Sequence, residues 1–261
     1  MSHSLSKKFT FGSLLMFALP TMIMMVVMSL YTIVDGVFVS RFVSTNALSS
    51  VNIVFPVINI VLGIAVMLST GSSAIVAKKM GEGRPDSARE TFSTIIFLNI
   101  VLGIFFSLVG NLAAEPLSRL LGASDLLLAD CITYLRWQLS FAPAMMLQVQ
   151  FQMYFVTEGR PGIGLFLTLL AGIANAVLDY VLIVPMELGI AGAAIATVTG
   201  YSISAVISFV RTFGLIVTCL LVLPALLAID GVWLAIPIAE AGSLLLCIYF
   251  TKKYKGKYQY L

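Results

Sequence analysis

The sequence contains few charged residues. Lys, Arg, Asp and Glu together make up 10% of its 261 residues, whereas hydrophobic residues make up 60% and the mean hydropathy is +1.05. The net charge of +3 comes from short clusters and not from a basic patch with interleaved aromatic residues, so we expect no nucleic-acid partner. This composition is typical of a chain that is mostly embedded in a membrane.

Histidine and cysteine are also scarce. The one histidine is His3, in the polar N-terminal stretch, and the three cysteines are Cys131, Cys219 and Cys247. Their spacing matches no zinc motif and is too sparse for a disulfide framework. A membrane enzyme would need a metal cluster or a His or Ser site, so we expect neither an enzyme nor a protein-bound cofactor.

Apolar runs of about 20 residues recur along the chain, which is roughly the length that crosses ~30 Å of hydrocarbon. They predict an all-α polytopic membrane protein with about eight transmembrane helices. The predicted spans are 9–38, 46–70, 91–113, 130–156, 165–184, 190–208, 212–229 and 232–251. Pro20, Pro56 and Pro143 lie inside spans, where kinks are tolerated if neighbouring groups satisfy the freed backbone.

Lys and Arg residues in the short connections predict the orientation. With the N-terminus placed in the cytoplasm, 12 of the 15 basic residues fall on the cytoplasmic side. They are Lys7, Lys8, Lys78, Lys79, Arg84, Arg89, Arg160, Arg211, Lys252, Lys253, Lys255 and Lys257. We therefore predict a multi-pass protein of the cell membrane with both termini in the cytoplasm. The segment Lys78–Glu90 is interpreted as a basic cytoplasmic turn, because it lacks the strand and ending of a phosphate-binding loop.

The most informative residue is Asp179, an acid in the middle of an apolar run. Carboxylates inside a membrane are costly and mark a path for an ion, a proton or a substrate. Asn175 lies four residues earlier, on the same helical face. Asp35 is a second acid late in the first span, and two carboxylates that meet in a low-dielectric cavity cannot both ionise cheaply. Oxygen ligands of this kind suit Na⁺ or H⁺.

Less specific interpretations remain for these residues. Asp35 could be an interfacial residue at the end of its helix, and Asp179 could be a buried carboxylate satisfied only for packing. The next span offers two hydroxyls, Thr197 and Thr199. Glu240 is a third predicted intramembrane acid and Arg136 an intramembrane base that could pair with one of the acids.

Several motifs together resemble the multidrug and toxin extrusion (MATE) family of cation-coupled efflux transporters. They are Leu19-Pro20, Val34–Val39, Asn46-Ala47-Leu48, Phe55-Pro56, Gly71–Gly83, Glu158–Pro161, Asn175–Asp179 and Gly189–Thr197. Their order and spacing are similar to the six-helix N-lobe of that family over roughly residues 9–205. The resemblance implies a monovalent cation or proton site in this lobe, formed by Asp35, Asn175, Asp179 and Thr197. It also places Tyr134 on the substrate path.

The resemblance implies three segments. Residues 1–208 correspond to the N-lobe of six transmembrane helices, residues 209–251 resemble the last two spans of the family, and residues 252–261 form a basic cytoplasmic tail. By this resemblance, spans seven to ten of the family have no counterpart in the sequence. The resemblance thus predicts Na⁺- or H⁺-coupled efflux of cationic or amphipathic organic compounds across the lipid bilayer. In this family the substrate cavity lies between two lobes, so an internal deletion of spans seven to ten would cripple transport. The alternative is a transport-incompetent helical bundle that acts through association with membrane proteins, including itself.

Overall fold

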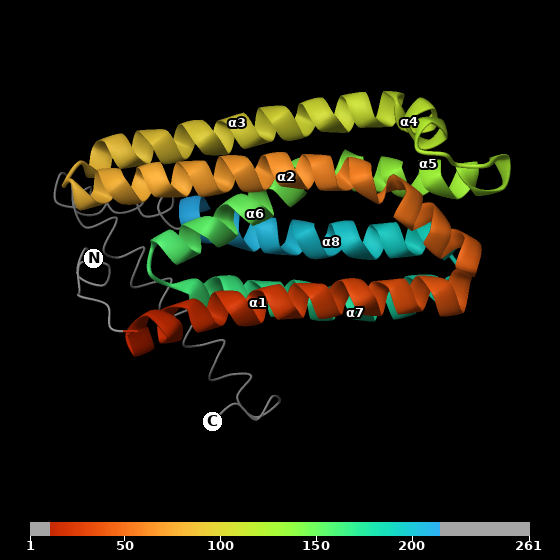
Figure 1. Cartoon of the computed structure of the whole chain (residues 1–261), viewed down its shortest axis with the longest axis horizontal. Helices are drawn as coiled ribbons and strands as arrows, with labels where there is room; N and C mark the ends of the chain where they lie inside the picture. Colours follow the sequence, from red (N-terminus) through yellow and green to blue (C-terminus); the bar gives the residue numbers. More distant parts are fainter. Residues whose placement is uncertain (1–10, 215–261) are drawn as a thin grey trace, which may run out of the picture. The chain divides into compact units, whose positions relative to one another are not determined.

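The computed structural model describes residues 11–214, which are almost entirely helical (Figure 1). The chain divides into two compact units, residues 1–205 and 206–261, and the described part of the second is 206–214. The helices of the described residues are α1 (Phe11–Phe38), α2 (Thr45–Gly81), α3 (Pro85–Leu112), α4 (Ala114–Leu120), α5 (Asp125–Ser140), α6 (Ala142–Thr157), α7 (Pro161–Ile183) and α8 (Gly189–Phe209). Two π-helical segments, η1 (Val39–Val43) and η2 (Val210–Gly214), follow α1 and α8.

Five described helical segments are long and apolar enough to cross a membrane. They are Ala18–Val43, Thr45–Gly81, Pro85–Leu112, Pro161–Ile183 and Gly189–Thr212. The all-helical membrane fold predicted from the sequence is confirmed, and the first six predicted spans correspond to α1, α2, α3, the pair α5–α6, α7 and α8. The predicted spans 212–229 and 232–251 and the tail 252–261 lie outside the described residues, apart from the η2 residues 212–214.

The fourth predicted span, 130–156, corresponds to two helices that are interrupted close to Pro143, one of the prolines expected to kink a span. The helical segment begins earlier, at Asp125, and is interrupted at Phe141 between α5 and α6. The cause is Pro143, which has no N–H to donate to the carbonyl of Leu139. The backbone N–H of Phe141 donates a hydrogen bond to the Leu139 carbonyl instead. Each half has 16 residues, or ~24 Å at 1.5 Å per residue, so neither half alone spans the hydrocarbon.

Polar side chains of α3 form hydrogen bonds with Ser140, next to the interruption. Ser107 Oγ donates to the carbonyl of Ser140 at 3.4 Å, and Asn111 Nδ2 donates to Ser140 Oγ at 2.9 Å. Non-helical backbone at membrane depth is tolerated only where protein or water supplies such partners. The break therefore depends on the neighbouring helix.

The predicted cytoplasmic turn Lys78–Glu90 is much shorter than expected. Helix α2 continues to Gly81, and α3 begins at Pro85, the first helical position that proline favours. Only residues 82–84 form the turn, where Gly83 adopts a φ of 71° that glycine accepts without strain. The glycines of this segment thus end one helix and do not cradle a phosphate.

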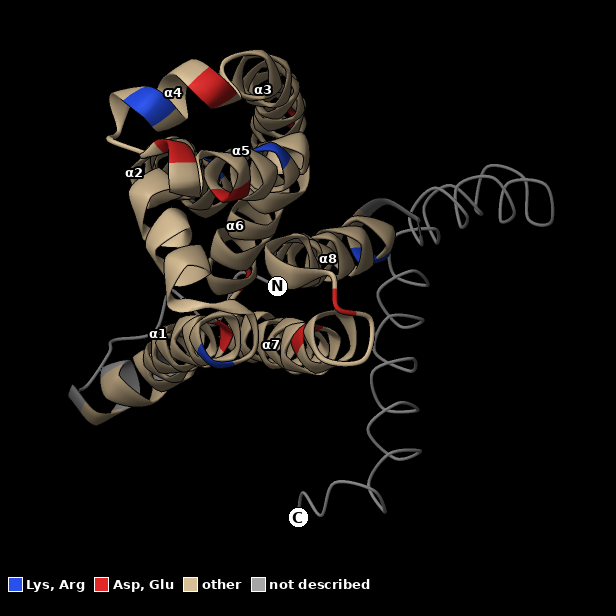
Figure 2. Ribbon diagram, turned by 90° about the vertical axis from the view of Figure 1, so that its right-hand side faces the viewer, with Lys and Arg blue, Asp and Glu red and all other residues tan. Residues whose placement is uncertain are grey.

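The helices of the first unit pack as two groups (Figure 2). Helices α2, α3, α5 and α6 contact one another, whereas α1 lies along α7. Contacts of α6 with α7, and of η1 with both α2 and α7, join the groups. The core of the first group contains large buried side chains, among them Leu135, Leu139 and Met146.

Two glycines let α3 approach α5 and α6 closely. A Cβ at Gly103 would lie 2.5 Å from Cα of Pro143, and a Cβ at Gly110 would lie 2.9 Å from Cβ of Leu139. Real Cβ atoms do not approach neighbours so closely. Small residues at such positions are the usual means by which membrane helices pack without a hydrophobic driving force.

A buried polar network centres on Gln150 and joins the same group of helices. The Gln150 Oε1 accepts from Asn99 Nδ2 at 2.9 Å and from Ser69 Oγ at 3.1 Å, while Gln150 Nε2 donates to Ser72 Oγ at 2.9 Å. All four side chains are buried. Interhelical hydrogen bonds of this kind stabilise α2, α3 and α6 against one another inside the membrane.

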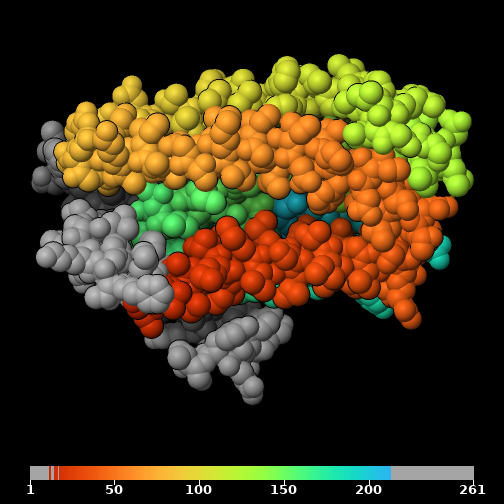
Figure 3. Space-filling view, in the orientation of Figure 1, coloured from red at the N-terminus to blue at the C-terminus, as the bar shows by residue number. Residues whose placement is uncertain are grey.

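Helices α1 and α2 share one face, with parts of α6 and α8 visible between them (Figure 3). On α1 the exposed side chains are apolar on several sides, including Met22, Val26 and Ile33. In a soluble protein this much apolar exposure would be unusual. In a membrane it is what a lipid-facing helix presents.

Candidate functional site

The polar residues predicted from the sequence meet between α1, α7 and α8. Asp35 lies near the end of α1, Asn175 and Asp179 lie one turn apart on α7, and Thr197 lies on α8. Helices α1 and α7 run side by side, which brings the two acids together (Figures 1 and 2). Asn175 and Asp179 are fully buried, and Asp35 is 8% exposed. Tyr134, from α5, is also buried and faces Asp35.

The cluster lacks internal partners for its polar atoms. When both carboxylates are ionised, five buried atoms have no hydrogen-bond partner: Oδ1 of Asp35, Oδ1 and Nδ2 of Asn175, and both carboxylate oxygens of Asp179. Nearly all buried polar groups in folded proteins are paired, so each exception needs an explanation. Five exceptions in one place indicate that something outside the chain, a cation, a proton or water, completes the site.

The carboxyl groups of Asp35 and Asp179 lie close enough to influence each other electrostatically. A hydrogen bond between two carboxyl groups requires that one of them carries a proton, because an ionised carboxylate only accepts. Two acids in such surroundings cannot both ionise cheaply, so a shared proton or a bound cation would stabilise the pair. The packing interpretation of Asp179 requires a fixed donor, and within the described residues neither of its carboxylate oxygens has a hydrogen-bond partner.

Hydroxyl groups surround the acids. Thr197 Oγ1 donates to the carbonyl of Ala193 at 3.0 Å, and the hydroxyls of Tyr31 and Tyr134 both approach it. Tyr201, one turn beyond Thr197 on α8, approaches Tyr31. Of the two threonines considered from the sequence, Thr197 lies in the cluster. Thr199 instead donates to the carbonyl of Ile195 at 2.7 Å and is only half-buried.

Tyr31 and Tyr201 were missed by the sequence reasoning, although a signal was available. Tyr31 precedes Asp35 by four residues, and Tyr201 follows Thr197 by four. Residues four apart share a helical face, so both tyrosines point the same way as their acid or hydroxyl partner. In an apolar run a tyrosine also suits the membrane interface, which is why neither stood out.

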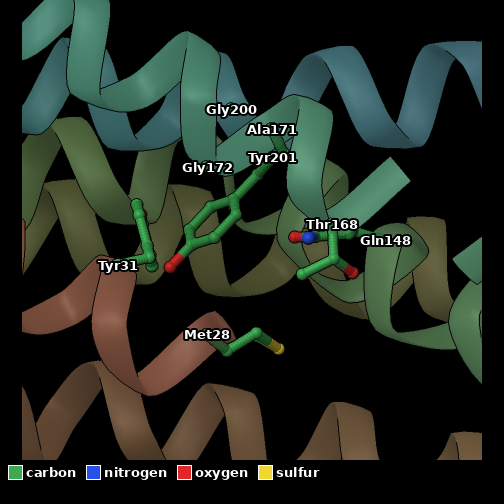
Figure 4. A pocket seen from close by; sticks show the side chains of 8 residues that line it. All are labelled: Met28, Tyr31, Gln148, Thr168, Ala171, Gly172, Gly200 and Tyr201. Carbon is green, nitrogen blue, oxygen red and sulfur yellow. The ribbon is translucent and has the colours of Figure 1, made fainter. Parts of the chain in front are cut away.

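A small cavity adjoins the cluster (Figure 4). The space open to the centre of a water molecule is about 20 Å³, enough for roughly one water. It is lined by Met28, Tyr31, Gln148, Thr168, Ala171, Gly172, Gly200 and Tyr201. In Figure 4 the Tyr201 ring reaches toward Tyr31, and Gln148 lies beside Thr168. The Gln148 side chain is 4% exposed.

Two other predicted intramembrane charges do not join the cluster. Arg136, on α5, is exposed and makes no ion pair within residues 11–214, so the pairing considered for it is not seen there. Glu240 lies outside the described residues. Within residues 11–214 no group of three or more His, Cys, Asp or Glu side chains is arranged to hold a metal ion. An oxygen-only donor set such as this one suits hard monovalent cations and protons.

The chain is similar in sequence to known membrane transporters. The MatE family model matches residues 20–181 of this chain. The multidrug export protein MepA of Staphylococcus saprophyticus is 24% identical over 191 residues, which cover 73% of this chain and 42% of that protein. The FAD transporter of Shewanella oneidensis is 28% identical over 195 residues, covering 73% of this chain and 43% of that protein.

Solved structures show the same likeness. The structure of a MOP superfamily transporter from Pyrococcus furiosus matches with a TM-score of 0.71 and 26% identity, covering 76% of this chain and 43% of that one. The chain thus spans less than half the length of the relatives that it matches.

Proposed function

Because the chain belongs to the MatE family, we propose that it acts in secondary transport across the cell membrane, exporting cationic or amphipathic organic compounds in exchange for Na⁺ or H⁺. One relative is named for multidrug export and another for FAD transport, so the family carries chemically different compounds. The oxygen-rich cluster belongs to the coupling ion in this proposal. Tyr134 lies on the path of the organic substrate.

The observation that carries the proposal is the set of five unpartnered buried atoms on Asp35, Asn175 and Asp179. A bound Na⁺ would take the carboxylate and amide oxygens as ligands, with Thr197 within the same cluster. A bound proton would instead bridge the two carboxyl groups. Either ion removes the repulsion between two ionised acids in a low-dielectric site.

Ion binding then has a direct mechanical consequence. Asp35 and Asp179 lie on different helices, so the bound ion draws α1 and α7 together, and its loss drives their carboxylates apart. A ligand shifts a conformational equilibrium only by its differential affinity for the two states. The cation therefore favours the state in which α1 lies tightly on α7, and the exported compound favours the other.

The orientation follows from the positive-inside rule, and we propose that the N-terminus, residues 82–84 and Arg160 are cytoplasmic. In this arrangement η1 and the connection between α7 and α8 lie on the outer side. A cysteine placed at Ser124, in the connection before α5, should react with an impermeant maleimide added from outside.

The test of the ion site is thermal unfolding of the purified protein in detergent, with Na⁺ or with choline at equal ionic strength. Na⁺ is expected to raise the unfolding temperature, and the rise should grow with pH because carboxylates must lose their protons before they bind Na⁺. At 100 times its Kd a ligand adds about 2.7 kcal/mol to stability. Asp179→Asn should abolish the Na⁺ effect, and Asp86→Asn, whose side chain is 96% exposed, should preserve it.

Equal Na⁺ responses of the two variants would exclude Asp179 from the site. A protein that responds only to pH, with or without Na⁺, would identify H⁺ as the coupling ion. Export from liposomes tests the transport step separately. Ion binding without export would favour the second candidate, a transport-incompetent helical bundle that retains the ion site and acts through association with membrane proteins.

A further inference from the structure

A second, larger pocket opens at the end of the first unit where η1 meets the connection between α7 and α8. Its volume is about 340 Å³, and it is lined by Phe42, Val43, Ile183, Val184, Glu187 and Gly189. None of these residues belongs to the cluster around Asp179. Ile183 lies one helical turn beyond Asp179, or ~6 Å along the axis of α7. Pockets of a few hundred Å³ with apolar walls and few polar groups are typical of small-molecule sites.

Apart from Glu187 the side chains that line this pocket are apolar, and the pocket opens widely to its surroundings. Phe42 stacks on Phe38 with ring centroids 5.6 Å apart and is still 49% exposed. Ile183 is buried. A Cβ at Gly189 would lie 3.7 Å from Val43, which shows that η1 and the start of α8 approach each other closely. The pocket therefore presents an aromatic ring and aliphatic side chains to whatever enters.

Glu187 is the one charged residue in the lining. It is exposed and makes no ion pair with the residues that the structure describes. Its φ of 52° places it in the left-handed region, the only residue other than glycine there within residues 11–214. The two neighbouring backbone N–H groups fix this conformation, since Met186 donates to Val181 and Leu188 donates to Leu182, at 3.3 and 3.0 Å.

The backbone conformation does not explain why this residue is a glutamate. Glycine or asparagine adopts the left-handed region at lower cost. Strained positions of this kind often coincide with functional sites. What glutamate adds is a carboxylate without a partner beside an apolar pocket.

From this arrangement we propose that the pocket binds an amphipathic organic monocation, with the charged group at Glu187 and the apolar body against Phe42 and the aliphatic wall. An aromatic face suits the apolar body of such a ligand and also attracts its positive charge. Arg41, in η1, is the nearest basic residue in sequence and lines no part of the pocket. Its positive charge repels a cationic ligand, so Arg41 weakens binding.

The experiment is equilibrium dialysis of radiolabelled tetraphenylphosphonium against the purified protein at low ionic strength, with empty micelles as the blank. Tetraphenylborate, an anion of the same shape, is the matched probe. All proteins carry Asp179→Asn, which removes the cluster as a competing cation site, so this test is separable from that of the proposed function. Glu187→Gln is compared with Glu115→Gln, an exposed acid that pairs with Arg119 at 3.2 Å on α4.

Tetraphenylphosphonium is expected to bind and tetraphenylborate not. Glu187→Gln should weaken binding by up to about fivefold, the upper end of the range for an exposed ion pair, and added salt should reduce the difference. Glu115→Gln should leave binding unchanged, Phe42→Ala should weaken it, and Arg41→Gln should tighten it. If Glu187→Gln misfolds on size-exclusion chromatography, Glu187→Asp, which keeps the charge, should bind as the parent does. Equal binding by the two glutamine variants, or of both probes, would overturn the proposal.

Discussion

Replacing Asp179 by asparagine should stabilise the ion-free protein at high pH, although Asp179 is a fully buried residue. Its two carboxylate oxygens have no donor, and the nearest charged group is the carboxylate of Asp35. Two unit charges about 4 Å apart repel by ~4 kcal/mol at an effective dielectric constant of 20. An asparagine amide removes this repulsion and can donate to Asp35. We therefore expect a gain of about 1–3 kcal/mol, part of the repulsion having been relieved already by relaxation.

The assay is unfolding in detergent without Na⁺ across a range of pH. At low pH the natural pair shares one proton, and the asparagine variant imitates that state, so the two proteins should be nearly equal in stability. As pH rises, the natural protein loses the shared proton and with it stability, whereas the variant keeps its hydrogen bond. The advantage of the variant should therefore grow with pH and disappear when Na⁺ is added to the natural protein.

A variant that is less stable than the natural protein at every pH would refute this reasoning. It would mean that the Asp179 carboxylate has a permanent donor and serves packing, as an ordinary buried acid does. Asp86→Asn is the control for a general effect of reducing negative charge, because that side chain is 96% exposed and should change stability by less than ~0.5 kcal/mol.

Two further predictions concern the packing that supports the site. Gly110→Ala forces a methyl group against Leu139 and should destabilise the protein by about 1–3 kcal/mol in denaturant unfolding, whereas Gly63→Ala, with nothing within 4 Å, should be neutral or stabilising. The reverse order would contradict the close approach of α3. Gln150→Met should cost about 1–2 kcal/mol in the same assay, because three hydrogen bonds between helices are lost. No loss would show that the freed groups pair equally well within their own helices.

The polar cluster was predictable from the sequence because each member follows from a local rule. An acid at membrane depth and an amide four residues away identify one face of α7 without knowledge of the fold. The family resemblance then selected Thr197 over Thr199, and the structure places Thr197 beside the tyrosines. That Asp35 lies opposite Asp179 depends on the packing of α1 along α7, which no local pattern encodes.

The features that the sequence left open have a common physical cause. The break at Phe141 and the length of α2 depend on which neighbours satisfy the backbone, and composition alone does not reveal those neighbours. The pocket beside Glu187 was missed for a similar reason. Its aromatic wall and its carboxylate come from segments more than 140 residues apart, and the left-handed backbone at Glu187 has no signature in the residue type.

The break between α5 and α6 also bears on how the chain enters the membrane. Neither half is long enough to cross alone, and the exposed carbonyl at Ser140 finds its donor on α3. Helix α3 precedes both halves in the chain, so during synthesis the donor is already in the bilayer when the broken segment arrives. Ser107 and Asn111 therefore serve as an assembly site for the next helix pair. Replacing Ser107 and Asn111 should therefore increase the amount of nascent protein that is retained or degraded during insertion. This effect should be larger than the effect on the stability of the folded protein.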